Sequence, residues 1–121
     1  MFKITGIYLN IMAVDREHTE LAQEVDHLHP AVLQAISLTA QGASKYRISL
    51  SVCGLMASER LAIPLLIGMG VKNLSMTVNV IPENKAFIRT LTHARCKEVA
   101  DYCLQLPTAI EVREYLKNQF N

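Results

Sequence analysis

The apolar and polar positions of this chain recur with two different periods, which predicts both strands and helices. Residues 2–14 are mainly apolar and partly β-branched, which predicts a strand ending in a turn at Asp15 and Arg16. Residues 47–52 alternate between polar and apolar and predict a second strand that leads into Cys53. Both predicted strands therefore end next to residues with charged or reactive side chains.

Between these two strands the sequence predicts helices. The polar residues 17–25 have room for one or two helical turns, and Pro30 stands where a first helical position is expected. Residues 31–43 then recur with the spacing of an amphipathic helix. The apolar face of that helix is expected to contain Val32, Leu33, Ile36 and Leu38.

A second helix is expected after Cys53, with Ser58 as its N-cap. It runs through residue 67, and Gly68 or Gly70 supplies its end. Pro64 would kink this helix unless the helix begins nearer Ala62, where proline is tolerated.

A short third strand over residues 71–76 precedes three more helices. The first is expected over residues 82–88, after the proline that opens it, and the second over residues 92–106, capped by its first threonine. Thr108 and Glu111 have the spacing of a capping box and predict a last helix to about residue 120.

Strands that alternate with helices predict an α/β fold with parallel pairing, since parallel neighbours need a long crossover. Ligands of such folds bind at the carboxyl ends of the strands. Arg16, Cys53 and residues 75–77 all lie at the carboxyl ends of predicted strands, so these three loops are expected on one face.

Composition narrows the class of protein. The chain has 121 residues and 13.5 kDa, so a single domain spanning 1–121 is expected, and an apolar fraction of 50% argues against disorder. Twelve basic and eleven acidic residues leave a net charge of +1, which argues against nucleic acid as a partner. No apolar run is long enough to span a membrane, and no secretory signal is recognisable. Three cysteines without a CxxC pair favour a reducing cytoplasm.

Arg16 and Cys53 are the candidate functional side chains. A guanidinium offers a rigid fork of donors for carboxylate or phosphate, although Arg16 is also placed to pair with Asp15 or Glu17 at the surface. An unperturbed thiol is about 97% protonated at pH 7 and can act as an acid, and Gly54 leaves backbone room for a ligand. The alternative for Cys53 is simple burial in the core.

Other motifs carry less chemistry. His27 and His29 are a weak signal of a metal site, because no third ligand has suitable spacing, and a turn before Pro30 is the better explanation. Cys96 and Cys103 are seven residues apart on one predicted helix, which indicates two core positions. The Gly-Met-Gly segment at 68–70 lacks the third glycine of a dinucleotide-binding motif and follows a helix.

The motifs of residues 13 to the end, taken together, resemble the C-terminal part of enzyme I of the bacterial phosphoenolpyruvate:sugar phosphotransferase system. The nitrogen-related paralogue is equally similar, and pyruvate phosphate dikinase and phosphoenolpyruvate (PEP) synthase are more distant. The motifs that carry the resemblance are Ala13-Val14-Asp15-Arg16, Leu28-His29-Pro30-Ala31-Val32-Leu33, Val52-Cys53-Gly54, Ala62-Ile63-Pro64-Leu65-Leu66-Ile67-Gly68-Met69-Gly70-Val71, Leu74-Ser75-Met76 and Ile81-Pro82.

The resemblance implies a (β/α)₈ TIM barrel that binds PEP and Mg²⁺ and passes the phosphoryl group to a histidine on a separate domain, for sugar uptake. It implies that Arg16 grips the anionic groups of the substrate. It also implies that Cys53 protonates the enolate carbon as pyruvate forms, beside Gly54. These roles fit a cation that neutralises charge and an acid that delivers a proton.

This chain also departs from the family pattern. The family's substrate-binding Asn and metal-binding Asp align with Thr5 and Gly6, so residues 1–12 are a poorly matched lead-in, and Leu55 replaces the glutamate after Cys-Gly. We therefore expect that this chain alone does not hold Mg²⁺. The sequence also lacks the phosphohistidine domain, so we expect little turnover and weak or lost binding of PEP or pyruvate. A non-catalytic binding or interaction module derived from the barrel is the alternative.

Length sets how much of a barrel is present. A (β/α)₈ barrel takes about 250 residues, so this chain accounts for about its last three βα units, followed by C-terminal helices. Such a piece exposes two sheet edges and an apolar face. We therefore expect a homo-oligomer, formed through those edges or by exchange of elements between two copies.

Overall fold

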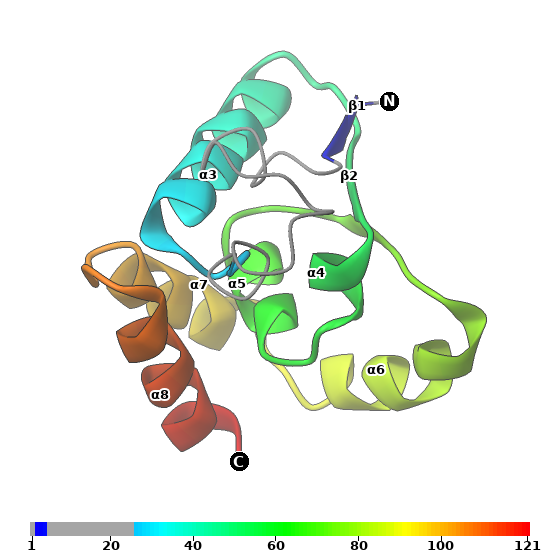
Figure 1. The fold of residues 1–121 in the computed structure, drawn as a ribbon. Coiled ribbons are helices and arrows are strands. Elements are labelled where there is room, and N and C mark those ends of the chain that lie inside the picture. Colours follow the sequence, from blue (N-terminus) through cyan, green and yellow to red (C-terminus); the bar gives the residue numbers. More distant parts are fainter. Residues whose placement is uncertain (1, 5–25) are drawn as a thin grey trace, which may run out of the picture.

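A small parallel sheet and the helices that pack beside it make up the described part of the chain (Figure 1). The computed structural model describes residues 2–4 and 26–121. Strand β2 (Leu50–Cys53) lies between β1 (Phe2–Ile4) and β3 (Asn73–Ser75), and both pairings are parallel. The predicted α/β class with parallel strands is confirmed. The rest of the strand expected over 2–14, the helical turns expected over 17–25 and Arg16 lie outside the described residues.

Helix α3 (Pro30–Lys45) forms most of the connection between β1 and β2 that the structure describes. The Nδ1 atom of His29 accepts a hydrogen bond from the backbone N–H of Ala31 at 3.1 Å, so His29 caps this helix. The buried face consists of Val32, Leu33, Ile36 and Ala40. The prediction for Leu38 is wrong: this side chain is 68% exposed. Leu38 stands two residues after Ile36, and about 200° of helical rotation turns it away from the core.

The first residues of the strand expected at 47–52 instead end helix α3. The N–H of Arg47 donates to the carbonyl of Ser44 and the N–H of Ile48 donates to that of Ala43, which is the bonding of a Schellman motif. Arg47 occupies its left-handed position, with φ of 54°. Strand β2 consequently begins only at Leu50, and its first three residues are buried.

Two short helices connect β2 to β3. Helix α4 (Leu55–Ser58) follows the strand directly, and α5 (Ala62–Gly68) comes after it. The predicted N-cap role of Ser58 is therefore wrong, because the expected helix is divided here and Ser58 is the last residue of α4. Pro64 lies in the first turn of α5, where a missing N–H is tolerated, so the helix begins at the later of the two predicted starts.

Helix α5 ends in a second Schellman motif. Gly70, with φ of 96°, donates to the carbonyl of Ile67, and Val71 donates to that of Leu66. Val71 is thereby used to end the helix, and β3 is shorter than the predicted 71–76. The segment at 68–70 ends a helix, as the sequence indicated.

Three C-terminal helices complete the fold: α6 (Ile81–Ile88), α7 (His93–Cys103) and α8 (Ala109–Phe120). A 3₁₀ turn at Val78–Val80 precedes α6. The hydroxyls of Thr92 and Thr108 accept hydrogen bonds from the N–H groups of Arg95 and Glu111, which confirms both predicted N-caps. None of the described helices is long and apolar enough to cross a membrane.

The main interface between helices joins α5 to α7 (Figure 1). Gly68 lies against the backbone of Cys96, and a Cβ atom at this position would stand 2.1 Å from the Cys96 carbonyl oxygen. Both Cys96 and Cys103 are fully buried, as their spacing predicted. The lack of a side chain at Gly68 therefore sets how closely the two helices approach.

Substituting this glycine should separate the helices. We expect Gly68→Ala to lower the free energy of unfolding by about 3 kcal/mol, since the added methyl group meets backbone atoms. Gly42→Ala in α3 is the matched control, because its Cβ meets no atom of the described residues within 4 Å, and this substitution should add about 0.5–1 kcal/mol of stability. Urea denaturation followed by circular dichroism measures both. Equal effects of the two substitutions would contradict this packing argument.

Candidate functional site

The carboxyl ends of β2 and β3 place Cys53 beside Ser75. The two residues are direct partners in the parallel register, and the Cys53 side chain is half-buried. Gly54 follows with φ of 86° and ψ of −159°, a backbone conformation that is open essentially to glycine alone. Apart from the adjoining residues, no described atom lies within 4 Å of the position that a Gly54 Cβ would occupy, so the described part of the chain leaves the backbone after Cys53 uncovered.

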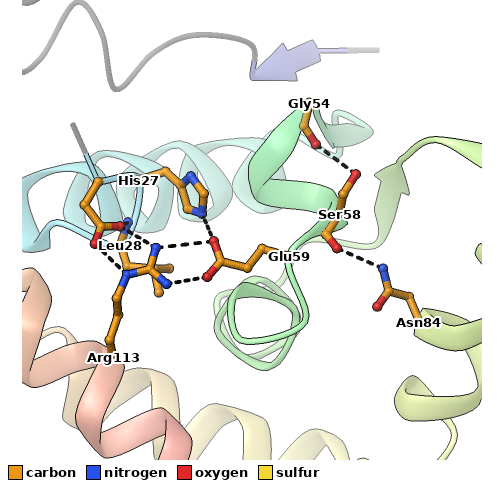
Figure 2. Close-up of polar contacts among 8 residues, drawn as sticks. His27, Leu28, Gly54, Ser58, Glu59, Asn84 and Arg113 are labelled. Carbon is orange, nitrogen blue, oxygen red and sulfur yellow. Dashed lines mark hydrogen bonds and ion pairs between the residues drawn. The ribbon is translucent and has the colours of Figure 1, made fainter. Parts of the chain in front are cut away.

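Helix α4 and Asn84 hold this turn in place (Figure 2). The Ser58 hydroxyl donates to the Gly54 carbonyl at 3.2 Å, which closes α4 back onto the turn. Asn84 of α6 is only 4% exposed, and its amide donates to the Ser58 carbonyl at 3.0 Å. The same amide contacts the sulfur of Met76 at 3.3 Å, just after β3. Asn84 therefore connects the segments that follow β2 and β3.

A cluster of charged residues lies on the other side of α4, and we call it the Arg113 cluster: Asp26, His27, Glu59 and Arg113. The guanidinium of Arg113 donates to Asp26 from Nε at 2.6 Å and from Nη2 at 2.8 Å. It also donates to Glu59, whose carboxylate accepts a hydrogen bond from His27 (Figure 2). One side chain from α8 thus connects the segment before α3 to the segment between α4 and α5.

The contacts in the Arg113 cluster favour the charged forms of Asp26, Glu59 and Arg113. Partial burial alone would raise the pKa of Glu59, but hydrogen bonds from His27 and Arg113 outweigh burial and lower the pKa to about 2. Burial opposes the shift at Asp26 too, yet hydrogen bonds from Arg113 and the Leu28 N–H lower its pKa. At Arg113 the hydrogen bond to Asp26 raises the pKa, and it outweighs partial burial, which alone would lower the pKa.

The structure places the other candidate residues in structural roles. His27 and His29 belong to the Arg113 cluster and to the start of α3, and the turn predicted before Pro30 is present, closed by a 3.0 Å bond from the His29 N–H to the Asp26 carbonyl. Burial raises the pKa of the Cys96 thiol, and that of Cys103 to about 11. Within residues 2–4 and 26–121, no group of three or more His, Cys, Asp or Glu side chains could hold a metal ion.

Sequence reasoning missed the partners of the Arg113 cluster and the role of Asn84. Arg113 and Asp26 are 87 residues apart in sequence, and no local periodicity connects them. Asn84 lies in the first half of a predicted helix, where an amide is ordinarily exposed. The available signal was the position of Asp26 shortly before one predicted helix and of Glu59 at the start of another.

Comparison with known proteins gives a consistent result. A family model described as "PEP-utilising enzyme, PEP-binding domain" matches residues 8–93. A multiphosphoryl transfer protein of Xanthomonas campestris is 44% identical over 103 residues, which is 85% of this chain and 12% of that protein. A phosphoenolpyruvate-dependent phosphotransferase system protein of Escherichia coli is 37% identical over 103 residues, again 85% of the chain, and 14% of that protein.

A phosphoenolpyruvate-protein phosphotransferase of Mycoplasma pneumoniae is 35% identical over 108 residues, which is 89% of the chain and 19% of that protein. The chain therefore spans between 12% and 19% of the length of these three relatives.

The Arg113 cluster makes stability depend on pH. A carboxylate whose pKa falls from an ordinary 4.5 to about 2 on folding stabilises the fold above pH 5, and this contribution is lost as the pH falls from 5 to 2. Between pH 5 and pH 2 the unsubstituted chain should lose roughly 2 kcal/mol of unfolding free energy through this carboxylate. The Glu59→Gln variant cannot lose this contribution, so its unfolding free energy should change less over the same range. Urea denaturation at a series of pH values measures the difference.

Glu98→Gln is the matched control, because Glu98 forms an exposed ion pair with Arg95 at 3.1 Å. Its stability should follow the unsubstituted chain at each pH. A Glu59→Gln profile parallel to that of the unsubstituted chain would show that the Arg113 cluster does not stabilise the folded state.

Proposed function

This chain belongs to the PEP-utilising enzyme family through its PEP-binding domain, and we propose that it binds PEP or pyruvate at the carboxyl ends of β2 and β3. The family match and the position of Cys53 support the proposal. The half-buried Cys53 side chain stands at a strand end, beside a backbone segment that the described residues leave uncovered. Parallel sheets bind ligands at this edge.

Cys53 is proposed as the acid of the reaction, and Arg16 and Gly54 as substrate-binding residues. The phosphoryl group leaves the enolate oxygen of PEP for a histidine on another domain, and the enolate carbon then takes a proton from the Cys53 thiol, which becomes a thiolate. Arg16 binds the anionic groups of the substrate, and the absence of a side chain at Gly54 lets the substrate approach the backbone. The matching relatives named as PEP-protein phosphotransferases support this reaction.

Mg²⁺ does not fit the described residues, since no suitable group of ligands is present among them. The positions that match the family's substrate and metal ligands, Thr5 and Gly6, carry no carboxylate. We propose that this chain alone does not hold the ion and turns over little PEP. The remaining stabilisation of phosphoryl transfer, and the phosphohistidine, would come from other protein parts.

The proposed architecture is the last three βα units of a (β/α)₈ barrel, with the chain in the cytoplasm. The parallel order β1-β2-β3, with helices between the strands, supports such a partial barrel. In the described residues, β1 and β3 are the outer strands of the sheet, and Asn73 and Ser75 of β3 are exposed. We propose that a second copy covers these edges, by direct pairing or by exchange of elements.

A second candidate function is a non-catalytic interaction module. Leu55 stands where the family has a glutamate, next to Gly54, and its side chain is 74% exposed. Val78, after β3, is 82% exposed. These apolar side chains follow the proposed substrate-binding strand ends, and they fit a protein partner better than a phosphate ester.

Calorimetric titration of the chain with PEP and Mg²⁺ decides between the two functions. We expect a dissociation constant of about 1 mM, or about −4 kcal/mol, that weakens at least tenfold in Arg16→Ala. Cys53→Ala should bind equally well, because a proton donor adds little to ground-state affinity. Arg47→Ala is the control, since Arg47 precedes β2 at the other end of the strand. No binding at 10-fold higher PEP (about 10 mM) would favour the interaction module.

Light scattering after size-exclusion chromatography tests the oligomer. We expect a mass above the 13.5 kDa of one chain. Asn73→Lys, at an exposed position of the outer strand β3, should shift the chain toward monomer because a charge on an edge opposes pairing. Leu38→Lys on the exposed side of α3 is the control. A stable monomer at high concentration of the unsubstituted chain would contradict the proposal.

A further inference from the structure

A pocket of about 290 Å³ lies between the end of α5, strand β3 and helix α6. Cys53 and Gly54 are not among the described residues that line it. Its volume is at the lower end of those that hold small molecules. The walls are mainly apolar and consist of Ile67, Val71, Leu74, Met76, Ile81 and Ile88.

The pocket has defined walls on two sides. Ile81, Lys85 and Ile88 are spaced by four and three residues on α6, so they lie on one face of that helix. On the other side, Leu74 is half-buried between two exposed residues of β3, and it lines the pocket. The bond from Asn84 to the sulfur of Met76 holds the end of β3 close to α6.

Two cations border this apolar space. Lys72 precedes β3 and Lys85 lies on α6, and both line the pocket. Neither lysine forms an ion pair with a carboxylate of residues 26–121, whereas Lys97 on α7 pairs with Asp101 at 3.2 Å. Two lysines that pair with no described carboxylate, beside six apolar side chains, form an amphipathic site.

We propose that this pocket binds a small carboxylate with an apolar body, such as a medium-chain acyl or aromatic acid. The hydrocarbon part would leave water for the walls formed by β3 and α6, at about 25 cal/mol per Å² of apolar surface. The carboxylate would lie between the two ammonium groups and neutralise them in part. A neutral apolar molecule leaves both charges uncompensated, and a small phosphate ester has too little apolar surface for these walls. The inference does not depend on the proposed PEP site.

Octanoate is the test ligand, added to the full ¹⁵N-labelled chain and followed by NMR. We expect saturable shifts centred on residues 72–76 and 85–88, at one octanoate per chain. Octan-1-ol lacks the carboxylate and acetate lacks the long hydrocarbon chain. Each should bind at least tenfold more weakly than octanoate.

The lysines are tested by Lys72→Gln/Lys85→Gln, which keeps most of each side chain's length. We expect a loss in octanoate affinity of about tenfold. The matched control is Lys97→Gln/Lys117→Gln, which removes the same charge from α7 and α8 and should bind octanoate like the unsubstituted chain.

Three results would overturn the proposal. The first is equal octanoate affinity for the pocket variant and the control variant. The second is binding of octan-1-ol as tight as that of octanoate, which would show an apolar groove without charge selection. The third is broadening of the same resonances with protein concentration alone, which would assign the pocket to contact with a second copy.

Discussion

One guanidinium connects three segments that are far apart in the sequence. Arg113 extends from the C-terminal helix α8 to Asp26, before α3, and to Glu59, between α4 and α5. His27 completes the arrangement by bonding to the same Glu59 carboxylate. Partly buried charges need such complete pairing, because removing one partner leaves the others desolvated without compensation. The arrangement also fixes one end of α4, which carries the turn after Cys53 at its other end.

Local chemistry made most of the helices predictable, while the strand limits depended on how helices end. Thr92 and Thr108 cap helices as their sequence context indicated. The strands were predicted too long because Arg47 and Val71, which fit a strand by pattern, are used in the Schellman motifs that end α3 and α5. A left-handed arginine carries no compositional signal of a helix end, whereas Gly70 does.

The candidate site, too, was predictable from the sequence only in part. The pattern of alternating residues led to Cys53 at a strand end, and Gly54 follows it in the turn. The residues that hold this turn in place, Asn84 above all, come from elements that only the folded chain brings together. Leu38 illustrates the opposite error, since an apolar residue near the right spacing was counted as core although it lies on the far side of its helix. Local pattern identifies residues by type, and tertiary contacts determine which of them meet.

The register of the parallel sheet affects how the chain emerges during translation. Phe2 pairs with Leu50, so the first strand leaves the ribosome about 50 residues ahead of its partner, a delay of roughly 3–10 s at common rates of synthesis. Throughout that interval β1 lacks β2, the partner with which it pairs in the described part of the chain. Chaperones that bind short apolar stretches on emerging chains would therefore meet this segment before the β1–β2 ladder can form.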